Sequence, residues 1–309
     1  MTTISNEEIK ETVKQVYSAR WSKEAQCCQS DEVEIFQASC QSCETAQQDK
    51  VIHEVHKRLI KELAPKEGMK ILDVGSGSGR TVLYIAEKVV STGKAVGVDV
   101  SNLAISLAKK RAKQAGLEGV AEIKLGDAEN LPFNDEIFDA VISECVISLV
   151  PDKQKALKEK VRVLKPGGRV IMHDVIRWME IPAVVKSDPS LYCSCIGGAV
   201  TIASYKDMMT KAGLENIKMI DYTKEEQAGL NSIALSAAAN IKNSDQYKQM
   251  ADFIHKGGIG YVLLIGTKSR QKNKKVRIKS VPTFQMSKSH QPNPYPLSFI
   301  WARKPTSIL

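Results

Sequence analysis

Hydrophobic residues recur at helical spacing in the first part of the chain. Ser5 and Glu8 form a capping box in front of a stripe of apolar residues. That stripe consists of Ile9, Val13, Val16 and Tyr17. A second stripe, ended by a proline that cannot continue a helix, consists of Val51, Val55, Leu59 and Leu63. The pattern predicts an N-terminal helix of about three turns, a polar loop over residues 22–48 and a second helix.

From Met69 onward, short apolar runs alternate with amphipathic segments. The predicted strands are 70–74, 95–100, 121–125, 138–143, 169–174, 216–222 and 261–266. The predicted helices are 81–90, 103–115, 153–164, 202–212 and one or two within 233–255. Strands that alternate with helices are typical of βαβ units, in which helices cover both faces of a parallel sheet. We therefore expect an α/β fold with seven strands, in which residues 175–200 form an insertion.

The composition is that of a globular protein. Of the 309 residues, 43% are hydrophobic and 26% are charged, and no run of 18 apolar residues could span a bilayer. The first ten residues are polar and unlike a secretory signal peptide, so we expect a cytoplasmic protein with reduced thiols. The seven cysteines then indicate reactive thiols, metal ligands or ordinary buried residues rather than disulfides.

The net charge of +9 is concentrated at one end of the chain. Residues 267–309 contain ten Lys or Arg and no Asp or Glu, whereas the rest holds 34 basic and 35 acidic side chains. A basic tail can contact nucleic acid or anionic lipid, but a nucleic-acid enzyme also needs a basic, aromatic stripe, which the body lacks. We expect N-terminal helices over 1–68, a catalytic domain over 69–266 and a disordered tail over 267–309. We also expect a monomer without membrane or nucleic-acid partners.

A glycine-rich turn follows the first predicted strand. Asp73 precedes a run whose candidate cofactor-binding residues are Gly75, Ser76, Gly77 and Gly79. Glycine permits a sharp turn and lets a nucleoside-containing ligand approach the backbone at the carboxyl edge of the sheet. The spacing is G-x-G-x-G, and Arg80 stands where the dinucleotide fingerprint G-x-G-x-x-G requires its third glycine.

Two further strand ends carry candidate cofactor-binding residues. Asp99 and Val100 end the second strand, where a carboxylate can accept hydrogen bonds from ribose hydroxyls. Asp127 and Ala128 follow the third strand, within reach of an adenine amino group. Each aspartate taken singly is equally compatible with a helix cap or a turn. Ligand-binding groups at three successive strand ends favour a cofactor site.

Residues 69–174 resemble the broad class I methyltransferase group, which includes quinone-biosynthesis and sterol methyltransferases. The resemblance is carried by the G-x-G-x-G turn with its preceding acid, by residues 127–133 (DAENLPF) and by residues 164–168 (LKPGG). It implies a Rossmann-like, seven-stranded sheet with helices on both faces. It also implies that S-adenosylmethionine is the cofactor.

A more specific resemblance, over roughly residues 5–266, is to the arsenite methyltransferase family. Residues 143–153 (SECVISLVPDK) and 192–199 (YCSCIGGA) carry it. The resemblance implies that Cys145 and Cys195 are catalytic thiolates that bind trivalent arsenic, and thiolates are natural ligands of this soft element. The implied partners are trivalent arsenicals presented as thiol conjugates and a thiol reductant, glutathione or thioredoxin. Cys193 is assigned no role.

The chain departs from that family upstream of the glycine-rich turn, where a further cysteine is expected. None occurs between Cys43 and Cys145. A third arsenic ligand would then come from Cys28, Cys40 or Cys43. Otherwise two thiols bind arsenic, which suits methylarsenite better than arsenite. A zinc hypothesis, with spacing shorter than that of zinc fingers, rests on Cys40, Cys43, His53 and His56.

The sequence thus predicts a methyltransferase that transfers a methyl group from S-adenosylmethionine to thiolate-bound trivalent arsenic. One alternative is a carbon methyltransferase that acts on a quinone or other lipid, in which Cys145 is an incidental buried residue. An alternative of another class is a non-catalytic, thiol-based metalloid-binding protein, which the intact glycine-rich turn and Asp99 disfavour.

Overall fold

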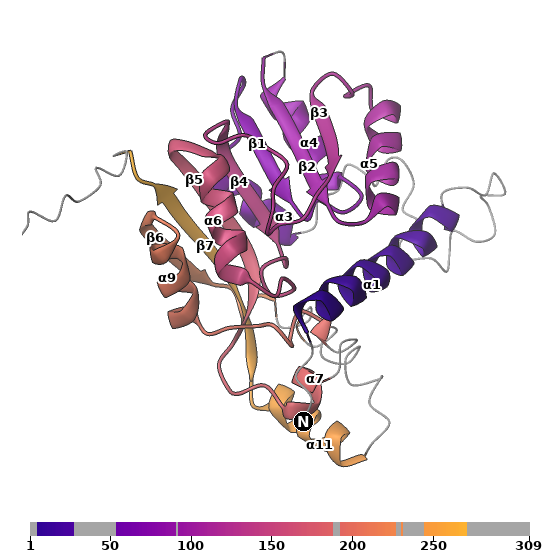
Figure 1. Ribbon diagram of the computed structural model, residues 1–309, viewed down its shortest axis with the longest axis vertical. Helices are drawn as coiled ribbons and strands as arrows, with labels where there is room; N and C mark the ends of the chain where they lie inside the picture. Colours follow the sequence, from indigo (N-terminus) through magenta and orange to yellow (C-terminus); the bar gives the residue numbers. More distant parts are fainter. Residues whose placement is uncertain are drawn as a thin grey trace, which may run out of the picture. The chain divides into compact units, whose positions relative to one another are not determined.

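The computed structural model describes residues 5–27, 54–90, 92–187, 192–226, 230 and 244–270, which contain a seven-stranded sheet with helices on both faces (Figure 1). The strands are β1 (Lys70–Val74), β2 (Lys94–Asp99), β3 (Ala121–Leu125), β4 (Phe138–Glu144), β5 (Leu164–Arg177), β6 (Leu214–Asp221) and β7 (Ile259–Lys268). The helices are α1 (Asn6–Cys27), α3 (Glu54–Leu63), α4 (Arg80–Val89), α5 (Asn102–Gln114), α6 (Lys153–Val163), α7 (Ala183–Ser187), α9 (Ile202–Lys211) and α11 (Ser244–His255). The predicted α/β fold is confirmed.

The strand order is β3-β2-β1-β4-β5-β7-β6. The strands β1 to β5 run parallel, and β7 is antiparallel to both of its neighbours, β5 and β6. The order reverses between β1 and β4. Open α/β sheets bind ligands at such a switch point, outside the carboxyl ends of the strands. The glycine-rich turn after β1 and Cys145 after β4 lie on either side of it.

Two apolar layers cover the sheet. Helices α3, α4 and α5 bury Leu59, Ile85 and Ala108 against one face. Helices α6 and α9 bury Leu157 and Met209 against the other face. Because the central strands are covered on both sides, most residues of β1 and β4 are buried. None of the helices in the described ranges is long and apolar enough to cross a bilayer.

Three elements extend far enough beyond their predicted bounds to move the boundary of a neighbouring segment. Helix α1 has 22 residues, so residues 22–27, which were predicted to be loop, are helical. Strand β5 continues to Arg177 because it pairs with β7 as far as Ile259, so the insertion begins after Arg177 rather than at residue 175. Strand β7 continues to Lys268 because it pairs with Leu214, so the predicted tail boundary at 267 was two residues early. Residues 28–53, which include most of the predicted loop, and residues 271–309, which include most of the predicted tail, lie outside the described residues.

A lysine lies within the apolar layer beneath α6. Lys160 is fully buried, and its Nζ has no hydrogen-bond partner among the described residues. Burial lowers the pKa of Lys160 to about 7, although the charges of Asp73 and Asp174 oppose this shift. Burial also raises the pKa of Asp73, at the end of β1, to about 7. The buried, unpaired amine of Lys160 therefore lowers the stability of the folded chain.

We expect Lys160→Met to raise the free energy of unfolding by about 1–2 kcal/mol, because an apolar side chain of similar length removes an unpaired buried amine. The pKa of Lys160 is lower in the folded chain than its ordinary 10.5. The gain should therefore be constant below about pH 7 and shrink as the pH rises from there to about 10.5. Urea unfolding at several pH values measures it. The exposed Lys158 of the same helix supplies the control, Lys158→Met, which should change the free energy of unfolding by no more than about 0.5 kcal/mol.

Candidate functional site

The predicted site residues surround one cavity at the carboxyl edge of the sheet, with a volume of about 1280 Å³. Those that line it are Gly75, Ser76, Gly77, Asp99, Val100, Asp127, Ala128, Cys145 and Cys195. Asp73 is not among them, because it is buried beneath the turn, and neither is Gly79, which precedes α4. Cys28, Cys40 and Cys43 lie outside the described residues. The cavity therefore brings the predicted cofactor residues and both predicted arsenic-binding cysteines together.

The glycine-rich turn needs glycine for two reasons. Gly75, Gly77 and Gly79 have φ angles of 77°, 54° and 84°, in the left-handed region that other residues adopt at a cost. A Cβ on Gly75 would also clash with Val146, and one on Gly77 would lie 2.7 Å from a ring carbon of Trp21. The turn thus passes close to neighbouring side chains while its backbone faces the cavity.

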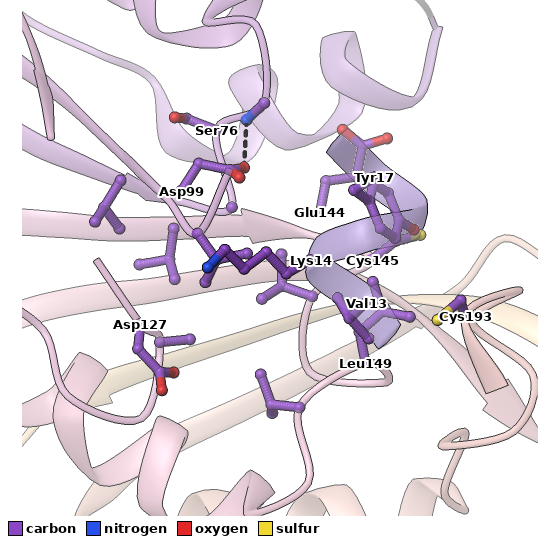
Figure 2. A pocket seen from close by; sticks show the side chains of 18 of the residues that line it. Val13, Lys14, Tyr17, Ser76, Asp99, Asp127, Glu144, Cys145, Leu149 and Cys193 are labelled. Carbon is purple, nitrogen blue, oxygen red and sulfur yellow. Dashed lines mark hydrogen bonds between the residues drawn. The ribbon is translucent and has the colours of Figure 1, made fainter. Parts of the chain in front are cut away.

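Asp99 has a second role besides the predicted one. Its Oδ2 accepts a hydrogen bond from the Gly77 N–H at 2.9 Å, drawn as the dashed line in Figure 2, and its Oδ1 accepts one from the Ser101 N–H at 2.9 Å. Burial raises the pKa of Asp99, although these backbone hydrogen bonds oppose the shift. A carboxylate has about four acceptor positions, so Asp99 can hold the turn and still accept from ribose hydroxyls.

Asp127 is engaged by a residue that the sequence analysis missed. Lys10 Nζ of α1 lies 2.8 Å from Asp127 Oδ2 and 2.7 Å from Glu129 Oε2. Burial lowers the pKa of Lys10, but the hydrogen bonds and charges of the two carboxylates outweigh it, and the net pKa is raised. The Asp127 carboxylate therefore anchors α1 in addition to facing the cavity.

One face of α1 forms a wall of the cavity. Lys10, Val13, Tyr17 and Trp21 follow one another at intervals of three or four residues and all line it. Figure 2 shows Val13 and Tyr17 directed from this helix toward Leu149 and Cys145. The predicted stripe included Val13 and Tyr17 correctly, but Val16 is 40% exposed and does not belong to it.

The two cysteines approach each other from different parts of the chain. Cys145 follows β4 and donates its backbone N–H to the His173 carbonyl at 2.8 Å, and Cys195 Sγ lies 3.9 Å from the Cys145 carbonyl oxygen. Their φ angles are 49° and 68°, unusual for residues other than glycine. Such strain costs about 1–3 kcal/mol per residue and is concentrated at functional sites. Cys193 also lines the cavity, and its thiol forms no disulfide.

The buried carboxylate of Asp174, which the sequence analysis did not single out, fixes the segment after β4. Its Oδ2 accepts from the N–H groups of Ile147 and Ser148 at 2.8 and 3.3 Å, and its Oδ1 accepts from its neighbour Val175 at 2.8 Å. Burial raises the pKa of Asp174, and the hydrogen bonds oppose this shift. The sequence signal that would have found it is an aspartate that ends the predicted strand 169–174, shortly after the apolar run 170–172.

The two thiols differ in their acidity. A hydrogen bond from the Cys145 thiol has the largest effect on the pKa of Cys195 and lowers it; burial and Asp174 oppose the shift, and Tyr17 adds to it. The net pKa of Cys195 is below its ordinary value. The pKa of Cys145 is well above its ordinary value, because of its interaction with Cys195 and its burial. The pair therefore loses its first proton from Cys195.

Two aromatic side chains stack behind Cys145. The Cys145 thiol donates to the hydroxyl of Tyr261 at 3.8 Å, and the Tyr261 ring stacks on His173 with centroids 4.8 Å apart. Burial lowers the pKa of His173 to about 4, so this imidazole is neutral at neutral pH. It therefore supports the site through packing rather than through charge.

The zinc hypothesis finds no support in the part of the chain that the structure describes. His56 Nε2 lies 2.7 Å from Glu144 Oε2, so this histidine pairs with a carboxylate at the end of β4. Burial lowers the pKa of His56, but Glu144 outweighs it, and the net pKa is raised. Within the described ranges, no three His, Cys, Asp or Glu side chains could hold a metal ion together. Cys40, Cys43 and His53 lie outside those ranges.

Comparison with known proteins agrees with this geometry. Residues 65–213 match the family model described as a methyltransferase domain. The chain is 38% identical over 152 residues to an arsenite methyltransferase of Halobacterium salinarum, covering 49% of this chain and 39% of that protein. It is 42% identical over 115 residues to a demethylmenaquinone methyltransferase of Staphylococcus aureus, covering 37% of this chain and 46% of that protein. The chain thus spans less than half the length of either relative.

Solved structures show the same fold. One is geranyl diphosphate C-methyltransferase from Streptomyces coelicolor in complex with S-adenosyl-L-homocysteine. Its TM-score is 0.55 at 18% identity, over 69% of this chain and 78% of that one. At this identity the likeness concerns the fold alone.

We expect Gly77→Ala to weaken S-adenosylmethionine binding by about tenfold or more, because the added Cβ meets Trp21 and the residue keeps a positive φ. Calorimetric titration measures the affinity. Gly116→Ala is the matched control, since Gly116 has a φ of 67° but nothing within 4 Å of an added Cβ. It should lower stability by about 1 kcal/mol and leave the affinity unchanged. Equal affinities for the two variants would contradict this account of the turn.

Proposed function

We propose that this chain, whose residues 65–213 form a class I, S-adenosylmethionine-dependent methyltransferase domain, transfers a methyl group to trivalent arsenic bound by Cys145 and Cys195. The observation that carries this proposal is the pair of strained, adjacent thiols at the wall of the cofactor cavity. The similarity to arsenite methyltransferases supports it.

The residues of the cavity fit the cofactor. Gly75 and Gly77 line the cavity with backbone that carries no Cβ atom, and Asp99 offers acceptors for ribose hydroxyls. Helix α4 begins at Arg80, and Gly79 before it supplies no side-chain cap, which leaves the first N–H groups of the helix available to a carboxylate. S-adenosylmethionine supplies an electrophilic methyl group at this site.

Arsenic is the substrate and the thiols hold it. Two thiolates displace two ligands of trivalent arsenic and leave its lone pair free to act as the nucleophile. The lone pair forms the arsenic–carbon bond while the electron pair of the carbon–sulfur bond leaves with the cofactor sulfur. No side chain needs to remove a proton in this step, because the thiols have lost theirs on binding.

The protein contributes alignment and the exclusion of water. The hydrogen bonds from Ile147 and Ser148 to Asp174 fix the segment that follows Cys145, and Cys195 Sγ lies 3.9 Å from the Cys145 carbonyl oxygen, so both thiols lie at one place in the cavity wall. Fixing two reacting atoms in this way replaces a bimolecular encounter with an intramolecular step. Helix α1 covers the cavity with Val13, Tyr17 and Trp21, which keeps water from the reacting atoms.

Two thiolates suit methylarsenite, which has one carbon on arsenic and two exchangeable ligands. Inorganic arsenite has three exchangeable ligands, so it would need a third thiol from the protein or from a small molecule. A thiol reductant, glutathione or thioredoxin, would deliver the arsenical as a conjugate and restore trivalent arsenic between turnovers. We place the enzyme in the cytoplasm, where such reductants are abundant.

A second candidate is a carbon methyltransferase, which the similarity to the menaquinone-pathway enzyme favours. In that case the two cysteines would have no chemical part and their replacement by serine would leave catalysis intact. The left-handed backbone at both cysteines argues for a specific role, because a merely buried cysteine needs no such geometry.

We expect Cys145→Ser and Cys195→Ser each to reduce methylation of methylarsenite by at least about a hundredfold, because a hydroxyl is a poor ligand for a soft element. Separation of the arsenic species after incubation with S-adenosylmethionine and glutathione measures the activity. Calorimetric binding of S-adenosylmethionine should be unchanged in both variants, which controls for folding. Full activity of either variant on every trivalent arsenical tried would contradict the proposal.

Cys193→Ser tests whether the site uses two thiols or three. Because the proposed site uses Cys145 and Cys195, we expect this variant to keep its activity on methylarsenite. A loss as large as that of Cys195→Ser would instead assign a third thiol to the site.

A further inference from the structure

The two thiols of the site have different hydroxyl partners. The hydroxyl of Tyr17, on α1, lies 3.8 Å from Cys195 Sγ. Cys145 Sγ lies 3.8 Å from the hydroxyl of Tyr261, on β7, and is itself the donor. A phenol hydroxyl can donate to a thiolate, and such charge-assisted hydrogen bonds are stronger than neutral ones. Tyr17 is thus placed to stabilise a thiolate at Cys195.

We propose that Tyr17 is a positioning residue whose hydroxyl donates a hydrogen bond to the sulfur of Cys195 and makes Cys195 the first of the two thiols to engage a thiophilic substrate. This assignment rests on the proposed function, because it concerns the order in which the two thiols bind arsenic. Cys145 is then the second thiol.

The position of Tyr17 is fixed by two sets of contacts. Tyr17 and Val13 pack against the apolar cluster that contains Cys195, Ile196 and Ala199. Seven residues before Tyr17, on the same face of α1, Lys10 bridges the carboxylates beside the third strand. Helix α1 is therefore held both by apolar packing and by the ion pairs of Lys10, and these contacts fix the Tyr17 hydroxyl beside Cys195.

The electrostatic surroundings agree with this order. The titratable groups that face Cys195 are Tyr17 of α1, Cys145 after β4, Lys153 of α6, Asp174 of β5, Tyr205 of α9 and Tyr261 of β7. Asp174 and burial raise the pKa of Cys195, whereas hydrogen bonds from Cys145 and Tyr17 lower it. Burial and the two cysteines raise the pKa of Tyr17, so its hydroxyl keeps the proton that it donates.

The binding step balances in two exchanges. The Cys195 thiolate forms a sulfur–arsenic bond, and one small-molecule thiolate leaves the trivalent arsenic with the electron pair of its own bond. That leaving thiolate takes the proton of Cys145. Cys145, now a thiolate, displaces the second small-molecule thiolate in the same way. Arsenic remains trivalent throughout, so no oxidant or reductant is required.

The test measures the acidity of each thiol without arsenic. The full chain is alkylated with iodoacetamide over a range of pH, and the modification of Cys195 and Cys145 is followed separately by peptide mass spectrometry. In the unchanged protein we expect the midpoint of the pH profile to be lower for Cys195 than for Cys145. In Tyr17→Phe we expect the Cys195 midpoint to rise by about 0.5–1 pH unit, because the ring remains and only the donor is lost.

Tyr84→Phe is the matched control, since Tyr84 lies on α4 and packs into the layer on the opposite face of the sheet from α6. It should leave both midpoints unchanged, and S-adenosylmethionine binding should be unchanged in both variants. The proposal is overturned if Cys145 has the lower midpoint, or if Tyr17→Phe shifts the Cys195 midpoint no more than Tyr84→Phe does. The alkylation assay contains no arsenical, so its outcome does not depend on the methylation assay of the cysteine variants. A failure of the Tyr17 proposal can therefore be distinguished from a failure of the proposed arsenic methylation.

Discussion

The buried carboxylate of Asp174 is the constraint on which the site depends. It accepts hydrogen bonds from the backbone after β4, at Ile147 and Ser148, and from its own neighbour in β5. These bonds fix the path of the chain beyond Cys145, whose carbonyl in turn contacts the sulfur of Cys195. A carboxylate withdrawn from water is costly unless its acceptors are satisfied. Here the acceptors of Asp174 are satisfied by the backbone that follows Cys145, so the same bonds that offset its burial also fix this side of the site.

Helix α1 connects the cofactor half of the cavity to the thiol half. Lys10 contacts the acidic residues after β3, Trp21 lies against Gly77 and Tyr17 contacts Cys195. The three residues lie on one face of one helix, so a displacement of α1 would disturb both halves together. The position of α1 therefore affects both the glycine-rich turn and the thiols, although these two parts of the cavity need not contact each other directly.

The sequence was informative where local geometry decides the outcome. Gly75, Gly77 and Gly79 predicted a sharp turn at the end of the first strand, and the structure has such a turn, with positive φ angles at all three glycines. Contacts between residues far apart in the chain produce no comparable short-range pattern in the sequence. The Tyr17 and Cys195 contact joins positions 178 residues apart, and the ion pair between Lys10 and Asp127 joins positions 117 apart. Helical periodicity indicated that one face of α1 is buried, but not what it is buried against.

The left-handed backbone at Cys145 and Cys195 was also beyond prediction from sequence, because it opposes local preference. Glycine would adopt these angles at less cost, yet glycine cannot bind a thiophilic element. The fold pays for the two cysteines with hydrogen bonds and burial in the surrounding segments. Such a compromise is expected where the direction of a side chain matters more than stability. The strain at these two positions therefore supports a chemical role for the thiols independently of any similarity to other proteins.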